Sequence, residues 1–151
     1  MTTTFRQDFS DFCAQRDAQN TIQLNVTKWT FMLCDALRQN YIDYSIKQHE
    51  RSLFRDLDNV PYHEACIEDL KNGQCDYDFI FESGKKYHKV IMVANGSRSV
   101  HCFIDKKTGE IYKSASWKSP AKGVRYDLRL IEQREWLLEN ADWSCAYLYA
   151  K

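Results

Sequence analysis

Glycine and proline are scarce in this chain, with five and two residues among 151. This scarcity excludes a collagen-like or low-complexity disordered protein, and 44% hydrophobic residues supply the apolar side chains for an ordered core. Charged residues interrupt every apolar run before the roughly 18 residues that a membrane span requires, and no basic stretch followed by an apolar one opens the chain. We therefore expect one soluble domain, residues 1–151, that is not secreted.

The sequence contains no Cys-x-x-Cys pair, which excludes a thioredoxin-like motif and a zinc ribbon. The six cysteines are scattered singly through expected helices and strands, so we expect reduced thiols, with Cys34 and Cys102 buried. His63, Cys66 and Cys75 come closest to metal-ligand spacing, but a fourth ligand is missing nearby. The sequence therefore predicts no metal site and no cofactor.

The net charge is zero, yet the charges are segregated along the chain. Residues 1–84 carry 14 acidic and 8 basic side chains, whereas residues 85–129 carry 11 basic and 3 acidic ones. Because salt limits the reach of each charge to about 10 Å, a basic segment can attract anions even on a neutral protein. The alternative is that the acidic helices lie against the basic segment and neutralise it.

Apolar residues recur at three- and four-residue steps through the first half, which predicts that residues 1–75 are mainly helical. We expect an amphipathic helix over about 4–19, capped by Thr4, and a second helix that begins at Asn20 and runs for about 25 residues.

A third helix is predicted over about 60–72. Asn59 is its expected cap, Pro61 lies in its first turn and Gly73 follows its end. A charged connection over residues 49–59 precedes it.

In residues 76–116 apolar and polar side chains alternate with a period of two, which predicts an antiparallel sheet. Asn95-Gly96 is the strongest two-residue hairpin signal, and a longer turn contains Gly109, which together give a three-stranded meander. If Ala94 pairs with Ser97, then Ile91 faces Val100 and Val90 faces His101.

The two faces of this meander differ. One is expected to pack against the helices and carries Ile91, Val93, Val100, Cys102, Ile104, Ile111 and Ala115. The other is either a ligand platform or a partly covered second core, and it carries His88, Val90, Met92, Ser99, His101, Phe103, Tyr112, Ser114 and Ser116.

The chain continues with a basic loop, residues 117–127, and a segment, residues 128–151, that holds a helix capped by Asp127 and an aromatic tail. The tail either docks as an added strand or forms a partner surface, so self-association through it is an alternative. The fold class expected is α+β, in which a three- or four-stranded antiparallel meander packs against N-terminal helices, with a further C-terminal helix.

Residues 86–128 contain several distinctive runs, which are RSVH at 98–101, FIDKKTG at 103–109, IYK at 111–113, ASWK at 115–118 and PAKGVRY at 120–126. This segment resembles one found in small proteins encoded by bacteriophages, particularly those of aquatic bacteria. The family is uncharacterised. The resemblance implies a phage origin and action in the host cytoplasm, but it assigns no catalytic or binding role.

The basic loop combines a stackable indole with cations, as single-strand binders and nucleotide pockets do. The predicted ligand-binding residues are Arg98, His101, Tyr112, Lys113, Trp117, Lys118, Lys122 and Arg125. Alternatively, this is a surface loop held against the sheet by Trp117 and Pro120.

His101 and Ser114 are expected cross-strand neighbours, but no nucleophile-elbow motif accompanies them, so we expect no enzymatic activity. The leading hypothesis is a small phage accessory protein that binds nucleic acid or a phosphorylated nucleotide. The alternative is a host-directed interaction protein that inhibits or redirects a bacterial enzyme or defence system.

Overall fold

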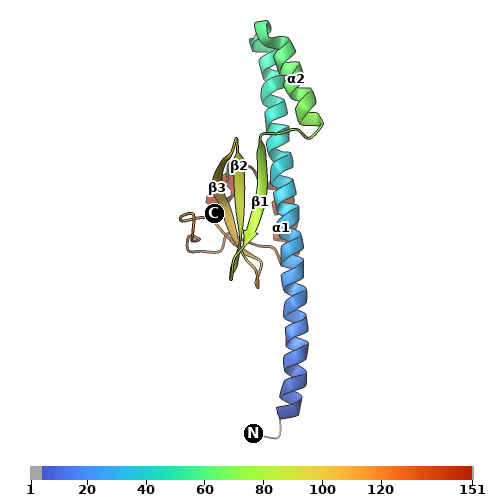
Figure 1. Ribbon diagram of the computed structural model, residues 1–151, viewed down its shortest axis with the longest axis vertical. Helices are drawn as coiled ribbons and strands as arrows, with labels where there is room; N and C mark the ends of the chain where they lie inside the picture. The colour runs from blue at the N-terminus through green and yellow to red at the C-terminus, as the bar shows by residue number, and fades with distance from the viewer. Residues whose placement is uncertain (1–4, 151) are drawn as a thin grey trace.

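The computed structural model describes residues 5–150, with side chains from residue 9 onward. Its longest element is α1, Phe5–Arg55, a 51-residue helix that runs along most of the molecule (Figure 1). The predicted division into two helices at Asn20 was wrong. The helix contains neither glycine nor proline, and asparagine in a helix interior costs less than about 1 kcal/mol. The expected cap Thr4 lies outside the described residues.

A single 3₁₀ turn, Leu57–Asn59, reverses the chain into α2, Val60–Lys71, which lies beside the C-terminal part of α1 (Figure 1). Pro61 is in the first turn, and Gly73 follows the helix with φ of +83°, as predicted. Asn59 precedes α2 but does not cap it through its side chain. The predicted connection 49–59 is helical as far as Arg55, because α1 continues into it.

Five strands form one antiparallel sheet in chain order, which confirms the α+β fold class. The strands are β1 Tyr77–Ser83, β2 Tyr87–Ala94, β3 Ser97–Asp105, β4 Glu110–Tyr112 and β5 Tyr126–Asp127. The Asn95-Gly96 turn joins β2 to β3, with φ angles of +51° and +84°. The basic loop is therefore a connection within the sheet, since its end returns as β5.

A β-bulge shifts the register of β2 and β3. Ala94 pairs with Ser97 and Ile91 with Val100, as predicted, but Val90 pairs with Cys102 because His101 is an extra residue in β3. The predicted opposition of Val90 and His101 was therefore wrong. The bulge also places Val90 on the same face as Cys102, whereas Ile91 was expected there.

The core lies between α1 and the sheet. Val26, Leu33 and Leu37 of α1 are fully buried, and they cluster with Phe79, Val90, Cys102, Ile104 and Ile111 of the sheet. The C-terminal region adds further buried side chains to this core, among them Leu128, Leu137, Tyr147 and Leu148.

The C-terminal segment contains α3, Ile131–Asn140, and the short helix α4, Ala146–Tyr149. The expected helix start near residue 128 was early, because Leu128 is buried in the core and Asp127 accepts a hydrogen bond from the Arg129 amide instead of capping α3. The tail docks as a helix and not as an added strand, with Tyr147 and Leu148 enclosed.

The N-terminal part of α1 extends past the sheet as an arm, defined here as residues 9–21 (Figure 1). Every side chain of the arm is exposed, including Phe9 and Phe12. Among the described residues, no helix is both long enough and apolar enough to cross a membrane.

Candidate functional site

A cleft of about 350 Å³ opens where the β1–β2 turn meets the basic loop. Its lining consists of Glu82, Ser83, Gly84, Lys85, Lys86, Tyr87, Lys89, Phe103 and Lys118. Lys85 and Lys86 come from the turn, Lys89 from β2 and Lys118 from the loop. The fold thus brings two separate stretches of basic sequence, residues 85–89 and the basic loop with Lys118, to one concave surface. We call this surface the basic cleft.

The basic cleft carries an excess of positive charge. Within the described chain, none of the four lysines lies within 4.0 Å of a carboxylate oxygen. Glu82, the one acid in the lining, forms an ion pair with Arg98, in which its Oε1 lies 3.1 Å from Arg98 Nη2. A hydrogen bond with Tyr87 raises the pKa of Lys86, which therefore stays charged. Lys106 adds a further cation by donating to the Gly84 carbonyl at 2.9 Å.

Trp117 lies next to the basic cleft and is 41% exposed. The Lys89 ammonium lies 4.4 Å from the indole centroid, and the Arg98 guanidinium lies 5.7 Å from it. These cation–π contacts orient the ring beside the lysines. The Ser116 hydroxyl accepts hydrogen bonds from the backbone amides of Lys118 and Ser119, which closes a turn around the tryptophan.

The structure brings together part of the predicted site. Lys118 lines the basic cleft, Arg98 and Trp117 lie beside it, and Tyr112 is also next to it, with its ring 6.1 Å from that of Tyr87. Two of the predicted cations are elsewhere. The Lys113 ammonium lies 4.7 Å above the Tyr149 ring, and the Arg125 backbone amide bonds to Ile111 beside β4. Lys122 is exposed on the same returning chain.

His101 does not reach the basic cleft. It is 2% exposed, and its Nε2 lies 2.7 Å from the Tyr147 hydroxyl while its Nδ1 lies 3.2 Å from Cys145 Sγ. Burial lowers the pKa of His101 to about 4, so the ring is neutral at neutral pH. The expected pairing with Ser114 is not formed, because the bulge displaces His101 and Ser114 bridges to Pro120.

Of the nine lining residues, the sequence predicted only Lys118 as ligand-binding. The eight that it missed include the cationic and aromatic ones, Lys85, Lys86, Tyr87, Lys89 and Phe103. A signal for them was present, since three lysines fall within five residues directly after Gly84. The linear sequence does not show that this run folds against Lys118, which lies some thirty residues later. The β2–β3 and β3–β4 turns create that proximity.

All six cysteines are free thiols in the structure, and Cys34 and Cys102 are buried as predicted. Burial raises the pKa of Cys34 to about 12. Among the described residues, no three histidine, cysteine or acidic side chains are grouped as metal ligands.

Comparison with protein families gives one match. Residues 9–150 fit the model of DUF7717, a family of unknown function, and the protein belongs to this family. No curated protein and no solved structure shows significant similarity to it.

Proposed function

We propose that the protein binds single-stranded nucleic acid or a phosphorylated nucleotide in the basic cleft. The observation that carries this proposal is the convergence of four lysines from two separate stretches of the chain, without a carboxylate partner among the described residues. Lysine ammonium groups neutralise phosphates, and the release of counterions drives such binding. On a protein of zero net charge, a group of cations without carboxylate partners attracts anions locally.

Aromatic rings supply the second half of the recognition. Tyr87 lines the cleft, and Trp117 lies beside it with part of its ring exposed, whereas the lining residue Phe103 is almost fully buried beneath them. Stacking on such rings tolerates any base, so this surface favours a strand or nucleotide with accessible bases over a closed duplex. The cleft volume is within the range of small-molecule sites.

The proposed activity is binding without catalysis. Ser83 lines the cleft and its hydroxyl lies 2.8 Å from His88 Nδ1, which resembles a nucleophile and its base. Burial, followed by the nearby Lys106 charge, lowers the pKa of His88 to about 4. A base this weak does not activate a hydroxyl at neutral pH, so the pair stabilises the fold. The resemblance to phage-encoded proteins supports an accessory role in the cytoplasm of an infected bacterium.

The test uses two charge-matched double variants. Lys85→Gln/Lys118→Gln removes two cations of the basic cleft, and Lys28→Gln/Lys71→Gln removes two exposed cations of the helices. Binding of a fluorescent oligothymidine is measured as a function of salt. We expect the cleft variant to bind more weakly and its slope of log affinity against log salt to fall by about 1.4, which is 0.7 per cation lost.

The control variant should retain the wild-type affinity and salt slope. Equal losses in both variants would show nonspecific attraction to total charge, and an absence of binding by the wild type at low salt would refute the proposal. A parallel titration with ATP and AMP separates a nucleotide ligand from a strand.

The exposed arm favours a second candidate, binding of a host protein. Phe9 and Phe12 are 65% and 55% exposed on a helix that projects beyond the sheet. Apolar contact with a partner would resist high salt, whereas binding through lysines would not. Deletion of residues 1–20 should abolish this partner binding and leave the oligothymidine affinity unchanged.

A further inference from the structure

The arm, residues 9–21, carries an apolar stripe that continues the core-facing side of α1. Steps of three and four residues lead from Phe9 and Phe12 through positions 16, 19 and 23 to Val26, which is fully buried in the core. Phe9 and Phe12 themselves are 65% and 55% exposed, because the sheet that covers α1 further along does not extend beside the arm (Figure 1). The arm therefore leaves uncovered the side on which α1 elsewhere packs against the rest of the protein.

This stripe has no packing partner within the described part of the chain, where every side chain of the arm is exposed. A buried phenylalanine contributes about 150–250 Å² of contact area, so two exposed rings on one side of a helix supply the apolar part of an interface. A helical segment without tertiary contacts is also only marginally stable by itself. Both properties favour a second helix that lies along the arm.

The stripe is complementary to its own reverse. Phe12 and Arg16 each lie two residues from Ala14. Phe9 and Gln19 each lie five residues from the same position. Two arms that run antiparallel and cross at Ala14 therefore place Arg16 of each copy opposite Phe12 of the other, where the guanidinium packs on the ring as a cation–π pair. Two parallel arms would instead place Arg16 opposite Arg16, and these like charges repel each other. The stripe thus favours an antiparallel second copy as its occupant.

The length of the projecting helix fits the same crossing point. α1 begins at Phe5, and Ile22 is the first partly buried residue after the exposed arm. The midpoint between these two residues lies at positions 13 and 14, next to the residue about which the stripe is complementary. With a rise of 1.5 Å per residue this segment is about 26 Å long, so two arms overlap along their whole length before the end of each meets the body of the other. The two acids of the arm, Asp11 and Asp17, lie outside the stripe.

We propose that two copies of the chain form a dimer through their arms, as an antiparallel helix pair with a two-fold axis at Ala14. The interface is isologous, so each copy contributes both members of the contact between Phe12 and Arg16. A contact between two single helices is smaller than the standard interface of about 1,600 Å², so we expect a dissociation constant of about 10–100 µM. At low micromolar concentration, where thermal melts are recorded, the protein is then monomeric. This dimer does not depend on the proposed nucleic-acid binding.

Sedimentation equilibrium over a concentration series tests the dimer with three variants whose changes lie on the exposed arm and leave the core intact. Phe12→Arg places two arginines opposite each other and should weaken association by about tenfold or more. Phe12→Arg/Arg16→Phe exchanges the two members of the contact and should restore the association of the wild type. Asp17→Asn is the control, because it changes the net charge as Phe12→Arg does but lies outside the stripe, and it should associate as the wild type does.

Three results would overturn the proposal. A wild type that stays monomeric at high micromolar concentration would leave the stripe to a different protein. Association that Phe12→Arg does not weaken would place the interface elsewhere, for example at the exposed Tyr149. A double variant that remains monomeric would show that Phe12 and Arg16 do not face each other.

Disulfide trapping tests the antiparallel orientation. The exposed Cys13 lies next to the proposed two-fold axis, and Asn20 lies on the same side of the helix one heptad later. Diamide oxidises two thiols to a disulfide and is itself reduced to the hydrazide. We expect Cys13 to cross-link two copies readily, with Cys13→Ser as the background. Cys13→Ser/Asn20→Cys should cross-link far more slowly, since the two new thiols lie about 18 Å apart along the helix axis. Equal rates at the two positions would overturn the antiparallel dimer, whatever the result of the oligothymidine titration.

Discussion

His88 and His101 are both about 2% exposed, and each has its two ring nitrogens next to protein atoms. Thr27 Oγ1 donates to the Gln23 carbonyl, so it accepts from His88 Nε2, and Nδ1 of His88 accepts from Ser83. Neutral His88 satisfies this pattern, and a protonated ring would only require the Ser83 hydroxyl to turn so that its oxygen accepts from Nδ1. The neutral form is therefore favoured by burial, followed by the nearby Lys106 charge, and not by the hydrogen bonds.

This burial makes stability depend on pH. The pKa values of His88 and His101 in the fold are about 4, below the ordinary value of 6.5, so the unfolded chain binds more protons between these values. Their stabilisation is present above pH 6.5 and is lost as the pH falls toward 4. Each histidine should lower the free energy of unfolding by roughly 1.4 kcal/mol per pH unit in that window. Urea unfolding at pH 7.5, 6, 5 and 4.5 measures this loss of stability. A free energy of unfolding that does not change with pH would contradict the prediction.

Trp117 and Trp136 form a natural pair for comparison, since they are 41% and 44% exposed. Trp117 lies beside the basic cleft, whereas Trp136 stacks on Tyr126 on the C-terminal side, with ring centroids 5.4 Å apart. We expect Trp117→Ala to weaken oligothymidine binding by about 1–3 kcal/mol per stacked base. Trp136→Ala should leave the affinity unchanged. The reverse order of effects would place the ligand on the α3 surface.

At the scale of elements, turns and alternation identified much of the sheet from sequence. Asn95-Gly96 predicted its hairpin because both positions need a positive φ that these residues tolerate. The bulge at His101 could not be predicted from the alternation of apolar residues, because no turn-forming residue in the sequence marks the inserted position. The single α1 helix was missed because Asn20 was interpreted as a helix cap. Without glycine or proline nearby, asparagine alone does not end a helix.

The same limit applies to the candidate site. Trp117 and Lys118 were found because they form a local run, and Arg98 because it lies in the motif before the bulge. Lys85, Lys86 and Lys89 join them only through the strand pairing of β1, β2 and β3. His101 was assigned to the wrong surface, because its position depends on the bulge and on the docked tail.

The hairpin turn gives an element-scale prediction. Gly96→Ala should destabilise the protein by about 1 kcal/mol, because φ at this position is +84° and an L side chain is strained there, even though space is open. Gly84→Ala is the matched control, since φ there is not positive and the new Cβ would meet only the Tyr87 carbonyl at 3.7 Å. Thermal unfolding of both variants should place Gly96→Ala lower, and the opposite ranking would show that the turn is relaxed.

At the scale of the whole molecule, the two ends contribute differently to stability. The arm is exposed throughout, whereas Tyr147 and Leu148 of α4 are buried against the core. The tail also accepts a hydrogen bond from Tyr126 at the Tyr147 carbonyl, 2.8 Å away. Self-association through the tail remains a proposal, and Tyr149, 60% exposed, is the aromatic side chain that α4 presents for it.

A pair of truncations follows from this asymmetry. Deletion of residues 1–20 should leave the melting temperature nearly unchanged, because the described part of that segment buries no side chain. Deletion of residues 142–151 should destabilise the protein by several kcal/mol, since it removes at least two fully or almost fully buried large side chains. Circular dichroism melts of both proteins compare them. A stable protein without its tail would contradict the core as described.

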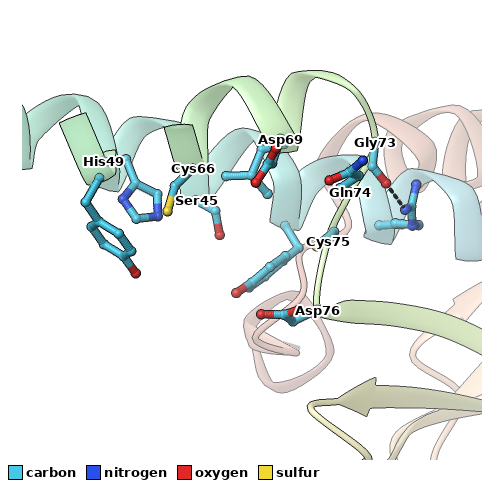
Figure 2. A pocket seen from close by; sticks show the side chains of 12 residues that line it. Ser45, His49, Cys66, Asp69, Gly73, Gln74, Cys75 and Asp76 are labelled. Carbon is cyan, nitrogen blue, oxygen red and sulfur yellow. Dashed lines mark hydrogen bonds between the residues drawn. The ribbon is translucent and has the colours of Figure 1, made fainter. Parts of the chain in front are cut away.

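The charge segregation seen in the sequence persists in three dimensions. The basic cleft lies at the β1–β2 turn and draws its lysines from the basic segment, whereas Asp69 and Asp76 of the acidic half line a different hollow, between α1, α2 and the linker to β1 (Figure 2). Arg98 with Glu82 is an ion pair that joins the basic segment to an acid outside it. The acidic helices therefore do not neutralise the lysines of the cleft, and these lysines remain available to a ligand.

The most direct test of the account is an NMR titration of labelled protein with a short oligothymidine at low salt. We predict amide shift changes concentrated at residues 82–89, 103 and 117–118, and loss of these changes when salt is raised. Shift changes centred on α2 or the arm, or none at millimolar ligand, would contradict the assignment of the basic cleft as the ligand-binding site.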